Sequence, residues 1–228
     1  MKINFLNSIL AVAVCSFTLV SCESETKEVT TEPTTTEVET PEVVTVENTT
    51  VYNANLASQD ELSLTGITDD LVAKVMANRP FVSMNELDAL LTEEVNKEEL
   101  YKHLFVPFNL NTTAEADFKM IPGVGDKMAH EFEEYRPYKS IKQFRKEIGK
   151  YVDEAEVTRY ESYVFVPVEL NTATEEDIKA LPGVGDKMAH EFDEYRPYSN
   201  IKQFSKEIGK YVDDNELKRL MRLVYLKK

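Results

Sequence analysis

Two nearly identical twelve-residue segments carry the residue types best suited to chemistry in this chain. Residues 181–192 have the sequence LPGVGDKMAHEF, and residues 121–132 repeat it with only the first residue changed. In each segment a Pro-Gly-x-Gly turn is followed closely by a lysine, Lys127 or Lys187, at the start of a predicted helix. Backbone N–H groups at a glycine-rich turn and at a helix N-terminus attract anions. The spacing therefore predicts that these turns contact phosphate groups.

The surroundings of the two turns also contain acidic residues. Asp126 and Asp186 directly precede the lysines, where they stabilise a helix N-terminus but oppose an incoming anion. The chain has a formal net charge of −15, of which residues 109–228 contribute only −3. The segments that hold the turns are thus close to neutral, and the acidity of the whole chain does not exclude a polyanionic partner. A Pro-Gly-x-Gly turn that merely joins two packed helices is the structural alternative.

The chain is organised as three repeats after residue 50. Residues 109–168 and 169–228 share 37 identities in 60 positions without a gap, which indicates an internal duplication. Residues 51–108 form a diverged copy that keeps an Asn-x-Asn start and an Arg-Pro-aromatic triplet. Each copy is short for an independent core, so we expect neighbouring copies to pack together.

Each repeat is predicted to contain four short helices, which makes the fold class all-α. In the last copy Thr174 is a suitable N-cap, and apolar residues recur at helical spacing after it. Gly185 is expected to take a positive φ and to end the preceding helix. Because no stretch shows sustained strand alternation, residues 164–168 are interpreted as a short extended connector.

With these residues in view, the repeats resemble the helix-hairpin-helix family, and more narrowly the ComEA-type domain of bacterial competence DNA receptors. The family spacing of apolar residues, two glycines and an alanine recurs at 118–132 and at 178–192. The resemblance implies contacts between hairpin amides and DNA phosphates that do not read the bases. Carried onto this chain, it assigns DNA contacts to Gly123, Val124, Gly125, Lys127, Gly183, Val184, Gly185 and Lys187. Similar tandem modules in the small extrinsic subunit of photosystem II serve protein contacts instead.

The first copy departs from this pattern. Thr68 stands in place of the second glycine, and Asp70 stands in place of the lysine, where it would repel phosphate. We therefore expect a structural role for residues 51–108. The second hairpin of the ComEA pattern is also reduced, with the single glycines Gly149 and Gly209. A few phosphate contacts per repeat imply weak binding that fades with salt.

Other candidate residues favour no further chemistry. His130 and His190 are equivalent in the two later repeats, but no second ligand stands at metal-binding spacing, so we expect half-exposed helix positions. Four tyrosines flank Arg-Pro pairs and either stack on nucleotides or pack internally: Tyr135, Tyr138, Tyr195 and Tyr198. The chain shows no P-loop and no nucleophile–base set. We predict no enzymatic activity, no catalytic residue, no metal and no cofactor.

Residues 1–22 resemble a bacterial lipoprotein signal. Lys2 precedes a short apolar run that ends in Leu-Val-Ser-Cys, so that Cys22 is the expected lipidation site. The run is too short to cross a membrane comfortably. An incidental cysteine after an ordinary secretory signal is the alternative. Residues 23–50, rich in Thr, Glu and Pro, are predicted to form a disordered acidic linker.

These features together predict a membrane-anchored, extracytoplasmic lipoprotein of a bacterial membrane or cell surface. It would bind double-stranded DNA weakly and without sequence preference, through the hairpins of residues 109–168 and 169–228, in DNA capture or uptake. The alternative is a non-enzymatic scaffold that contacts another protein of the cell envelope. Binding that weakens with salt and depends on the two lysines would separate these hypotheses.

Overall fold

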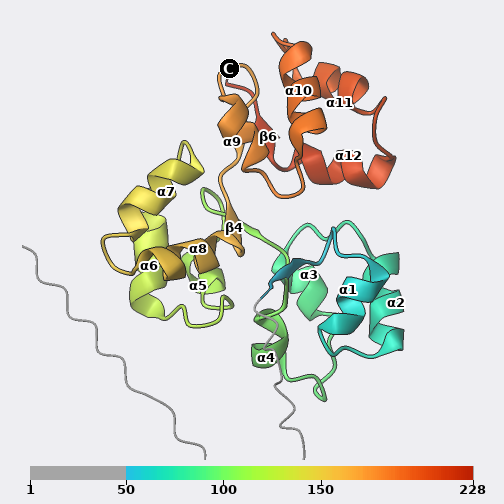
Figure 1. Cartoon of the computed structure of the whole chain (residues 1–228), viewed down its shortest axis with the longest axis vertical. Coiled ribbons are helices and arrows are strands. Elements are labelled where there is room, and N and C mark those ends of the chain that lie inside the picture. Colours follow the sequence, from blue (N-terminus) through green and yellow to red (C-terminus); the bar gives the residue numbers. More distant parts are fainter. Residues whose placement is uncertain (1–49, 228) are drawn as a thin grey trace, which may run out of the picture. The chain divides into compact units, whose positions relative to one another are not determined.

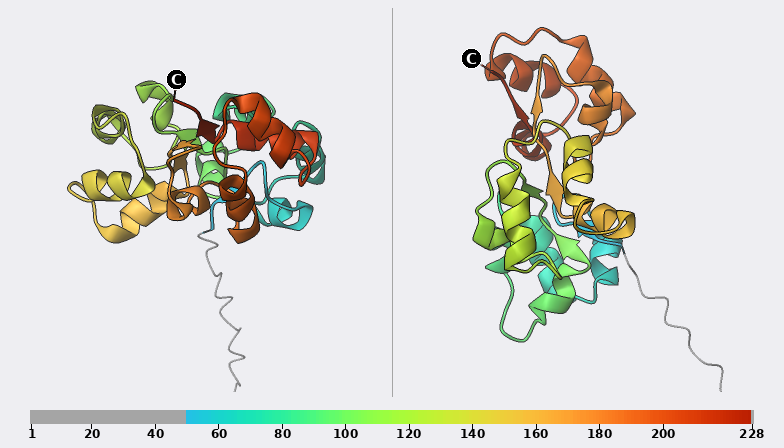
Figure 2. Two further views of the ribbon diagram at one scale, coloured as in Figure 1. Left: turned by 90° about the horizontal axis from the view of Figure 1, so that it is seen from above. Right: turned by 90° about the vertical axis from the view of Figure 1, so that its left-hand side faces the viewer.

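The computed structural model describes residues 50–227, which form three successive groups of helices in Figures 1 and 2. The predicted signal with Cys22 and the predicted linker up to residue 49 lie outside the described residues. We call residues 51–108, 109–168 and 169–228 repeat 1, repeat 2 and repeat 3.

Each repeat contains four short helices, as the sequence predicts. Repeat 1 holds α1 (Gln59–Leu64), α2 (Asp69–Ala77), α3 (Met84–Asp88) and α4 (Lys97–Tyr101). Repeat 2 holds α5 (Glu115–Phe118), α6 (Asp126–Glu134), α7 (Ile141–Ile148) and α8 (Glu154–Glu161). Repeat 3 holds α9 (Glu175–Lys179), α10 (Asp186–Glu194), α11 (Ile201–Ile208) and α12 (Asp214–Met221). Among residues 50–227, no helix has both the length and the apolar character needed to cross a membrane.

Short parallel strand pairs tie the start of each repeat to its end. The pairs are β1 (Tyr52–Asn53) with β2 (Leu104–Phe105), β3 (Phe108–Asn109) with β4 (Val164–Phe165), and β5 (Val168–Glu169) with β6 (Val224–Tyr225). The segment 164–168, which was expected to be only a connector, therefore contributes to two pairs. Two-residue strands leave no room for side-chain alternation, which is why no strand pattern was visible in the sequence.

The Asn-x-Asn and Arg-Pro-aromatic sequences of the repeats meet in one hydrogen-bonded unit. In repeat 3, the Asn171 side-chain amide donates to the Tyr198 carbonyl at 2.9 Å, and its oxygen accepts from the Tyr198 amide at 2.7 Å. Arg196 donates to the Leu170 carbonyl at 2.6 Å and to the Ala173 carbonyl at 2.9 Å. The equivalent bonds recur in repeats 1 and 2. These landmarks therefore fix the chain before α9 against the turn after α10, and their conservation between copies has a structural cause.

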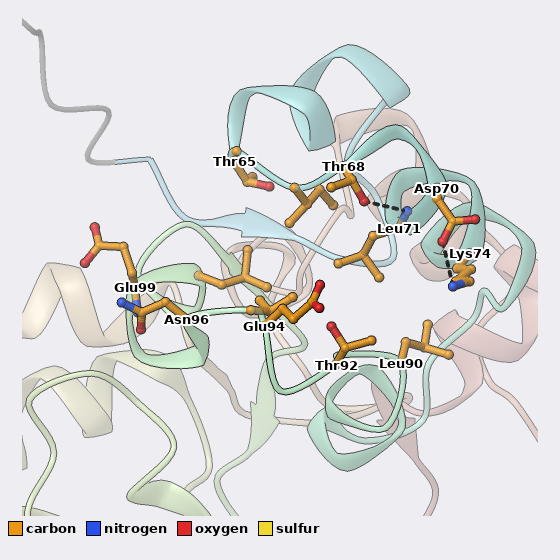
Figure 3. Close-up of a pocket in the computed structure, with 14 residues that line it drawn as sticks. Thr65, Thr68, Asp70, Leu71, Lys74, Leu90, Thr92, Glu94, Asn96 and Glu99 are labelled. Carbon is orange, nitrogen blue, oxygen red and sulfur yellow. Dashed lines mark hydrogen bonds and ion pairs between the residues drawn. The ribbon is translucent and has the colours of Figure 1, made fainter.

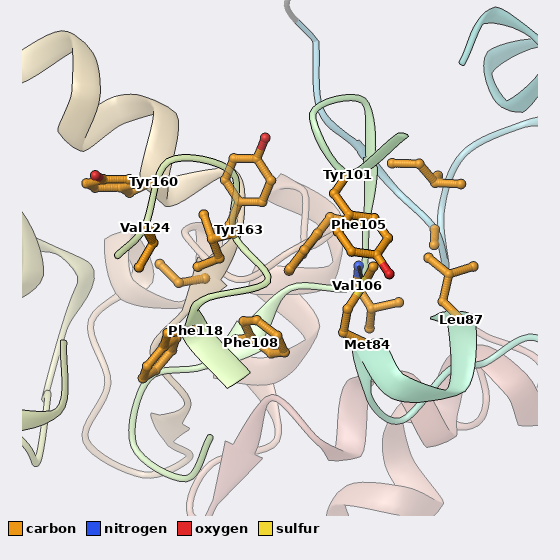
Figure 4. Packing of buried hydrophobic residues seen from close by; sticks show 14 of the residues in the cluster. Met84, Leu87, Tyr101, Phe105, Val106, Phe108, Phe118, Val124, Tyr160 and Tyr163 are labelled. Atoms are coloured by element: carbon orange, nitrogen blue, oxygen red, sulfur yellow. Dashed lines mark hydrogen bonds between the residues drawn. The ribbon is translucent and has the colours of Figure 1, made fainter. Parts of the chain in front are cut away.

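One apolar cluster is continuous through repeats 1 and 2, whereas repeat 3 has a second cluster, which also includes Phe165 and Val168 from the end of repeat 2. Figure 4 shows the junction, where Phe105 lies between the two repeats. Its ring is 5.0 Å from the Tyr163 ring and 5.1 Å from the Phe108 ring, both edge to face. Such pairs contribute roughly 0.5–1.5 kcal/mol beyond area burial. The expectation that neighbouring copies pack together is confirmed for repeats 1 and 2.

Candidate nucleic-acid interface

The three hairpins turn on a glycine with positive φ. Gly123, between α5 and α6, has φ +80°, and Gly183, between α9 and α10, has φ +70°. Gly66 has the same conformation in repeat 1, with φ +79°. This region of φ is costly for residues with a Cβ atom, so the first glycine of the pattern is the one that the turn requires.

The second glycine of the pattern begins the following helix as its N-cap and does not adopt the positive φ that was predicted for it. Gly185 has φ −89°, so the prediction of a positive φ at this position was wrong. Gly185 and its counterpart Gly125 are the N-cap residues of α10 and α6, in extended backbone that other residues adopt freely. Either glycine of a Pro-Gly-x-Gly sequence can adopt the positive φ that reverses the chain direction. In this protein the first glycine adopts it.

The N-termini of α6 and α10 are open. Neither Gly125 nor Gly185 has a side chain that could cap the first turn, and no side-chain cap is present. The first N–H groups of any α-helix have no acceptor within the helix. A Cβ atom built on either glycine would have no heavy atom within 4 Å. Both helix starts thus present unpaired amides to the surroundings, as anion binding requires.

The corresponding helix start in repeat 1 is closed. The Thr68 side chain accepts a hydrogen bond from the Leu71 amide at 3.3 Å and so caps α2 (Figure 3). Asp70, at the position of the hairpin lysine, forms an ion pair with Lys74 at 2.6 Å. A cavity of about 600 Å³ beside this hairpin is lined by Asp70, Glu94 and Glu99, with Lys74 as its basic residue. This end of repeat 1 therefore offers an anion one amide fewer than the later repeats, and no net positive charge.

Ion pairs neutralise the aspartates that stand beside the hairpin lysines. Lys119 contacts Asp126 at 2.8 Å, and Lys179 contacts Asp186 at the same distance. Hydrogen bonding from the lysine holds the pKa of each aspartate below its ordinary value. Each aspartate is thus held charged and paired, which limits the repulsion that it would exert on a phosphate.

The hairpin lysines themselves are available to a ligand. Lys127 and Lys187 are exposed, and neither forms an ion pair with any residue in the described part of the chain. Each follows the N-cap glycine by two positions, in the first turn of its helix. Lysine charge and open amides therefore occur at the same helix start in repeats 2 and 3.

In repeats 2 and 3, an arginine from the last helix lies against the first hairpin glycine. Arg159 of α8 donates to the Pro122 carbonyl at 2.8 Å, and Arg219 of α12 donates to the Pro182 carbonyl at 2.5 Å. A Cβ atom on Gly123 would be 3.3 Å from Arg159, and one on Gly183 would be 2.6 Å from Leu56 of repeat 1. The surroundings of the first glycines are therefore occupied, unlike those of the second.

The valines between the glycines lie in the core. Val124 and Val184 are 6% and 5% exposed, so their side chains cannot reach a ligand and only their backbone could. The DNA contacts assigned to all eight hairpin residues stay a prediction. The four glycines and the two lysines are exposed, and only the two valine side chains are excluded from contact with a ligand.

The tyrosines divide into two classes. Tyr138 and Tyr198 are buried, and their rings pack edge to face on Phe144 and Phe204, so their position excludes stacking on a nucleotide. Tyr135 and Tyr195 are half-buried and form hydroxyl–hydroxyl hydrogen bonds of 2.7 Å with the tyrosines that follow α7 and α11. For Tyr138 and Tyr198, internal packing is therefore the correct one of the two roles that the sequence left open.

The two repeat-equivalent histidines are surface residues. The His130 and His190 side chains are 63% and 74% exposed, more than the half-exposed positions expected. His130 Nδ1 is 3.4 Å from a Glu115 carboxylate oxygen, and this hydrogen bond raises the pKa of His130. Within residues 50–227, no three side chains of the metal-binding types come together.

Comparison with known protein families matches residues 164–222 to the helix-hairpin-helix motif. The match begins at β4, at the end of repeat 2, and runs through repeat 3 to the residue after α12, including the open hairpin of α9 and α10. This motif suggests DNA binding. Searches among curated proteins and among solved structures gave no match.

The sequence reasoning missed four basic residues that support the hairpins. They are Lys119, Lys179, Arg159 and Arg219. They occupy equivalent positions in repeats 2 and 3, and this recurrence could have marked them as candidates from the sequence alone. The arginines stand 37 residues from the prolines that they contact, and a sequence pattern cannot show a contact at that separation.

Proposed function

We propose that repeats 2 and 3 bind double-stranded DNA without sequence preference, through phosphate contacts at the N-termini of α6 and α10. The main support for this proposal is the difference between repeat 1 and the two later repeats at the start of the second helix. Repeats 2 and 3 combine an open helix start with an unpaired lysine, whereas Thr68 caps the equivalent helix of repeat 1 and Asp70 replaces the lysine. The helix-hairpin-helix match over residues 164–222 supports the same ligand for repeat 3.

The proposed contacts are few, and they determine the expected affinity. Two lysines and two sets of helix amides neutralise few phosphates, so binding should be weak and should fall steeply with salt. Phosphate contacts carry no base information, and no hairpin side chain other than the lysines extends to a ligand. This combination fits a protein that retains DNA rather than one that locates a particular site.

The proposed function includes a location and excludes catalysis. We place the protein outside the cytoplasm, held to a bacterial membrane by lipid on Cys22, where it would capture DNA in the manner of ComEA-type domains without cleaving it. Metabolic labelling with a palmitate analogue tests the anchor. Labelled protein in the membrane fraction, lost on Cys22→Ser, supports it, and an unlabelled secreted protein contradicts it.

Fluorescence anisotropy of a labelled duplex, titrated with residues 23–228 at low and near-physiological salt, tests the DNA contact. Lys127→Glu combined with Lys187→Glu should abolish binding. Lys127→Gln combined with Lys187→Gln should lower the salt slope by about 1.8, because each phosphate contact contributes about 0.9. Circular dichroism controls for folding, since both lysines are exposed and their replacement should leave helicity unchanged. Absence of binding at low salt would refute the proposal.

A protein-binding scaffold is the second candidate, and one observation favours it for repeat 1. Four large apolar side chains there are exposed: Leu64 at 66%, Val82 at 54%, Met76 at 43% and Leu56 at 39%. A single exposed apolar side chain is common on protein surfaces and needs no explanation. Several in one repeat favour a role in protein contacts. Salt-insensitive capture of one envelope protein, lost on Leu64→Ser with Val82→Ser, would support this candidate.

A further inference from the structure

A lysine face lies on α7 and again on α11, outside the hairpins. Lys142, Lys146 and Lys150 follow one another at intervals of four residues, and Lys202, Lys206 and Lys210 repeat the arrangement. We call these six residues the lysine face. Residues four apart lie on the same side of a helix, so Lys142 and Lys146 form one strip on α7, and Lys202 and Lys206 form one on α11. Lys150 and Lys210 lie two residues after the helix ends.

The fold turns this strip towards solvent. Phe144 and Ile148 are fully buried on α7. Lys142 and Lys146 each lie two positions from Phe144, on the opposite side of the helix. The Lys146 and Lys206 side chains are both 78% exposed. All six lysines are exposed and therefore accessible to a large ligand.

The local acidic residues do not cancel the lysine face. Glu147 contacts Lys150 and lies 4.0 Å from Lys146, and Glu207 is placed in the same way in repeat 3. Residues 139–151 carry five basic residues and one acidic residue, and residues 199–211 carry three and one. Both segments keep an excess of positive charge in a chain that is acidic overall.

Repeat 1 lacks the lysine face at the same positions where it lacks the open hairpin. Without a gap in the alignment, the three lysines of repeat 2 correspond to Asn85, Ala89 and Glu93. Residues 82–94 carry four acidic residues and no basic one. Hairpin lysine, N-cap glycine and lysine face thus occur together in repeats 2 and 3 and are all absent from repeat 1.

We infer that the lysine faces of α7 and α11 form a second DNA-contacting surface, which adds phosphate contacts to those of the hairpins. The inference rests on the proposed DNA binding and deepens it. A surface of this kind increases affinity and salt dependence together, because every added phosphate contact releases counterions. It reads no bases, since lysine on a solvated helix surface contacts the sugar-phosphate backbone as a point charge.

The test removes four lysine charges and compares the result with an equal loss elsewhere. The variant carries Lys142→Gln, Lys146→Gln, Lys202→Gln and Lys206→Gln. Lys150 and Lys210 stay, because each lies over a tyrosine ring and has a role in packing. The control carries Lys74→Gln, Lys97→Gln, Lys218→Gln and Lys227→Gln, with the same net charge. Both are titrated as residues 23–228 against the duplex over a range of salt.

The lysine-face variant should bind at least ten-fold more weakly at low salt, with the salt slope lowered by up to about 3.6. The control should change affinity no more than three-fold. Acetylation of the unaltered protein by an amine reagent, read by mass spectrometry, should show the four lysines protected by DNA.

Three outcomes would overturn the inference. The first is equal DNA affinity of the lysine-face variant and the control, while the variant at Lys127 and Lys187 loses DNA binding. This outcome leaves the proposed function intact. The second is an unaltered chain that binds no DNA, which removes both proposals. The third is loss of binding to phosphatidylglycerol vesicles, but not to DNA, on removal of the four lysines, which assigns the face to lipid.

Discussion

Single residues decide whether a hairpin of this protein can accept an anion. Thr68 and Gly125 occupy the same N-cap position in repeats 1 and 2, and they differ in whether a side chain satisfies the first amides. A threonine hydroxyl at this position competes with a phosphate oxygen for the same N–H groups. The loss of a glycine from repeat 1 therefore has a physical meaning beyond sequence divergence.

Copying the cap of repeat 1 into the later repeats should separate stability from binding. Gly125→Thr with Gly185→Thr should raise the free energy of unfolding by roughly 0.3 kcal/mol per site, and nothing within 4 Å obstructs the new side chains. DNA affinity should fall because the hydroxyls occupy the amides. Urea unfolding and anisotropy measure the two effects. Unchanged affinity in a more stable protein would show that the amides do not bind phosphate.

Much of this residue-level picture could be predicted from the sequence, because it depends on local residue types. The glycines, the lysines and the substitution at Asp70 are visible in a twelve-residue window. The assignment of positive φ to Gly185 failed because both glycines of the pattern permit a reversal, and only the packed turn selects Gly183. The pairing of Lys119 with Asp126 also depends on how α5 and α6 are placed.

At the scale of elements, the last helix supports the hairpin of the same repeat in repeats 2 and 3. The Arg219 side chain of α12 is 4% exposed and bonds both Glu216 oxygens as well as the Pro182 carbonyl. Arg159 of α8 makes the equivalent contacts with Glu156 and Pro122. The hairpin is thereby held in place by a helix that contributes no residue to the proposed DNA contact.

Removal of this support should be costly. Arg219→Met keeps the apolar stem but leaves the half-buried Pro182 carbonyl and the Glu216 carboxylate without their donor, which should lower the free energy of unfolding by about 1–3 kcal/mol. Arg145→Met is the matched control: Arg145 pairs with Glu161, but its side chain is 52% exposed, and an exposed pair contributes about 0–1 kcal/mol. Urea unfolding of both variants makes the comparison. Equal losses would contradict the supporting role of Arg219.

At the scale of the whole described chain, the repeats are not equivalent in packing. Repeats 1 and 2 share one core, and repeat 3 contacts repeat 1 through a hydrogen bond from Arg222 to the Phe81 carbonyl and through Leu56 against Gly183. A repeat period predicts a chain of equal neighbours, so this difference was not predictable from it. It arises from Phe105 and Tyr163, which meet across repeats 1 and 2.

The division of the core predicts how unfolding propagates. Phe105→Ala and Phe204→Ala each remove a fully buried ring, at a cost of about 3–5 kcal/mol. Hydrogen exchange should accelerate in repeats 1 and 2 together for the first variant, and chiefly in repeat 3 for the second. If Phe204→Ala accelerates exchange equally in all three repeats, residues 50–227 form one cooperative unit instead.

The three strand pairs have a consequence for the ancestry of the chain. Each pair places the first and last residues of a repeat side by side, and only two residues separate β2 from β3 or β4 from β5. A copy of the coding segment inserted at such a junction would enter and leave at neighbouring points. The gene could therefore have lengthened by tandem copying without any existing module being rerouted, and each new copy was then able to acquire or lose its positive charges separately.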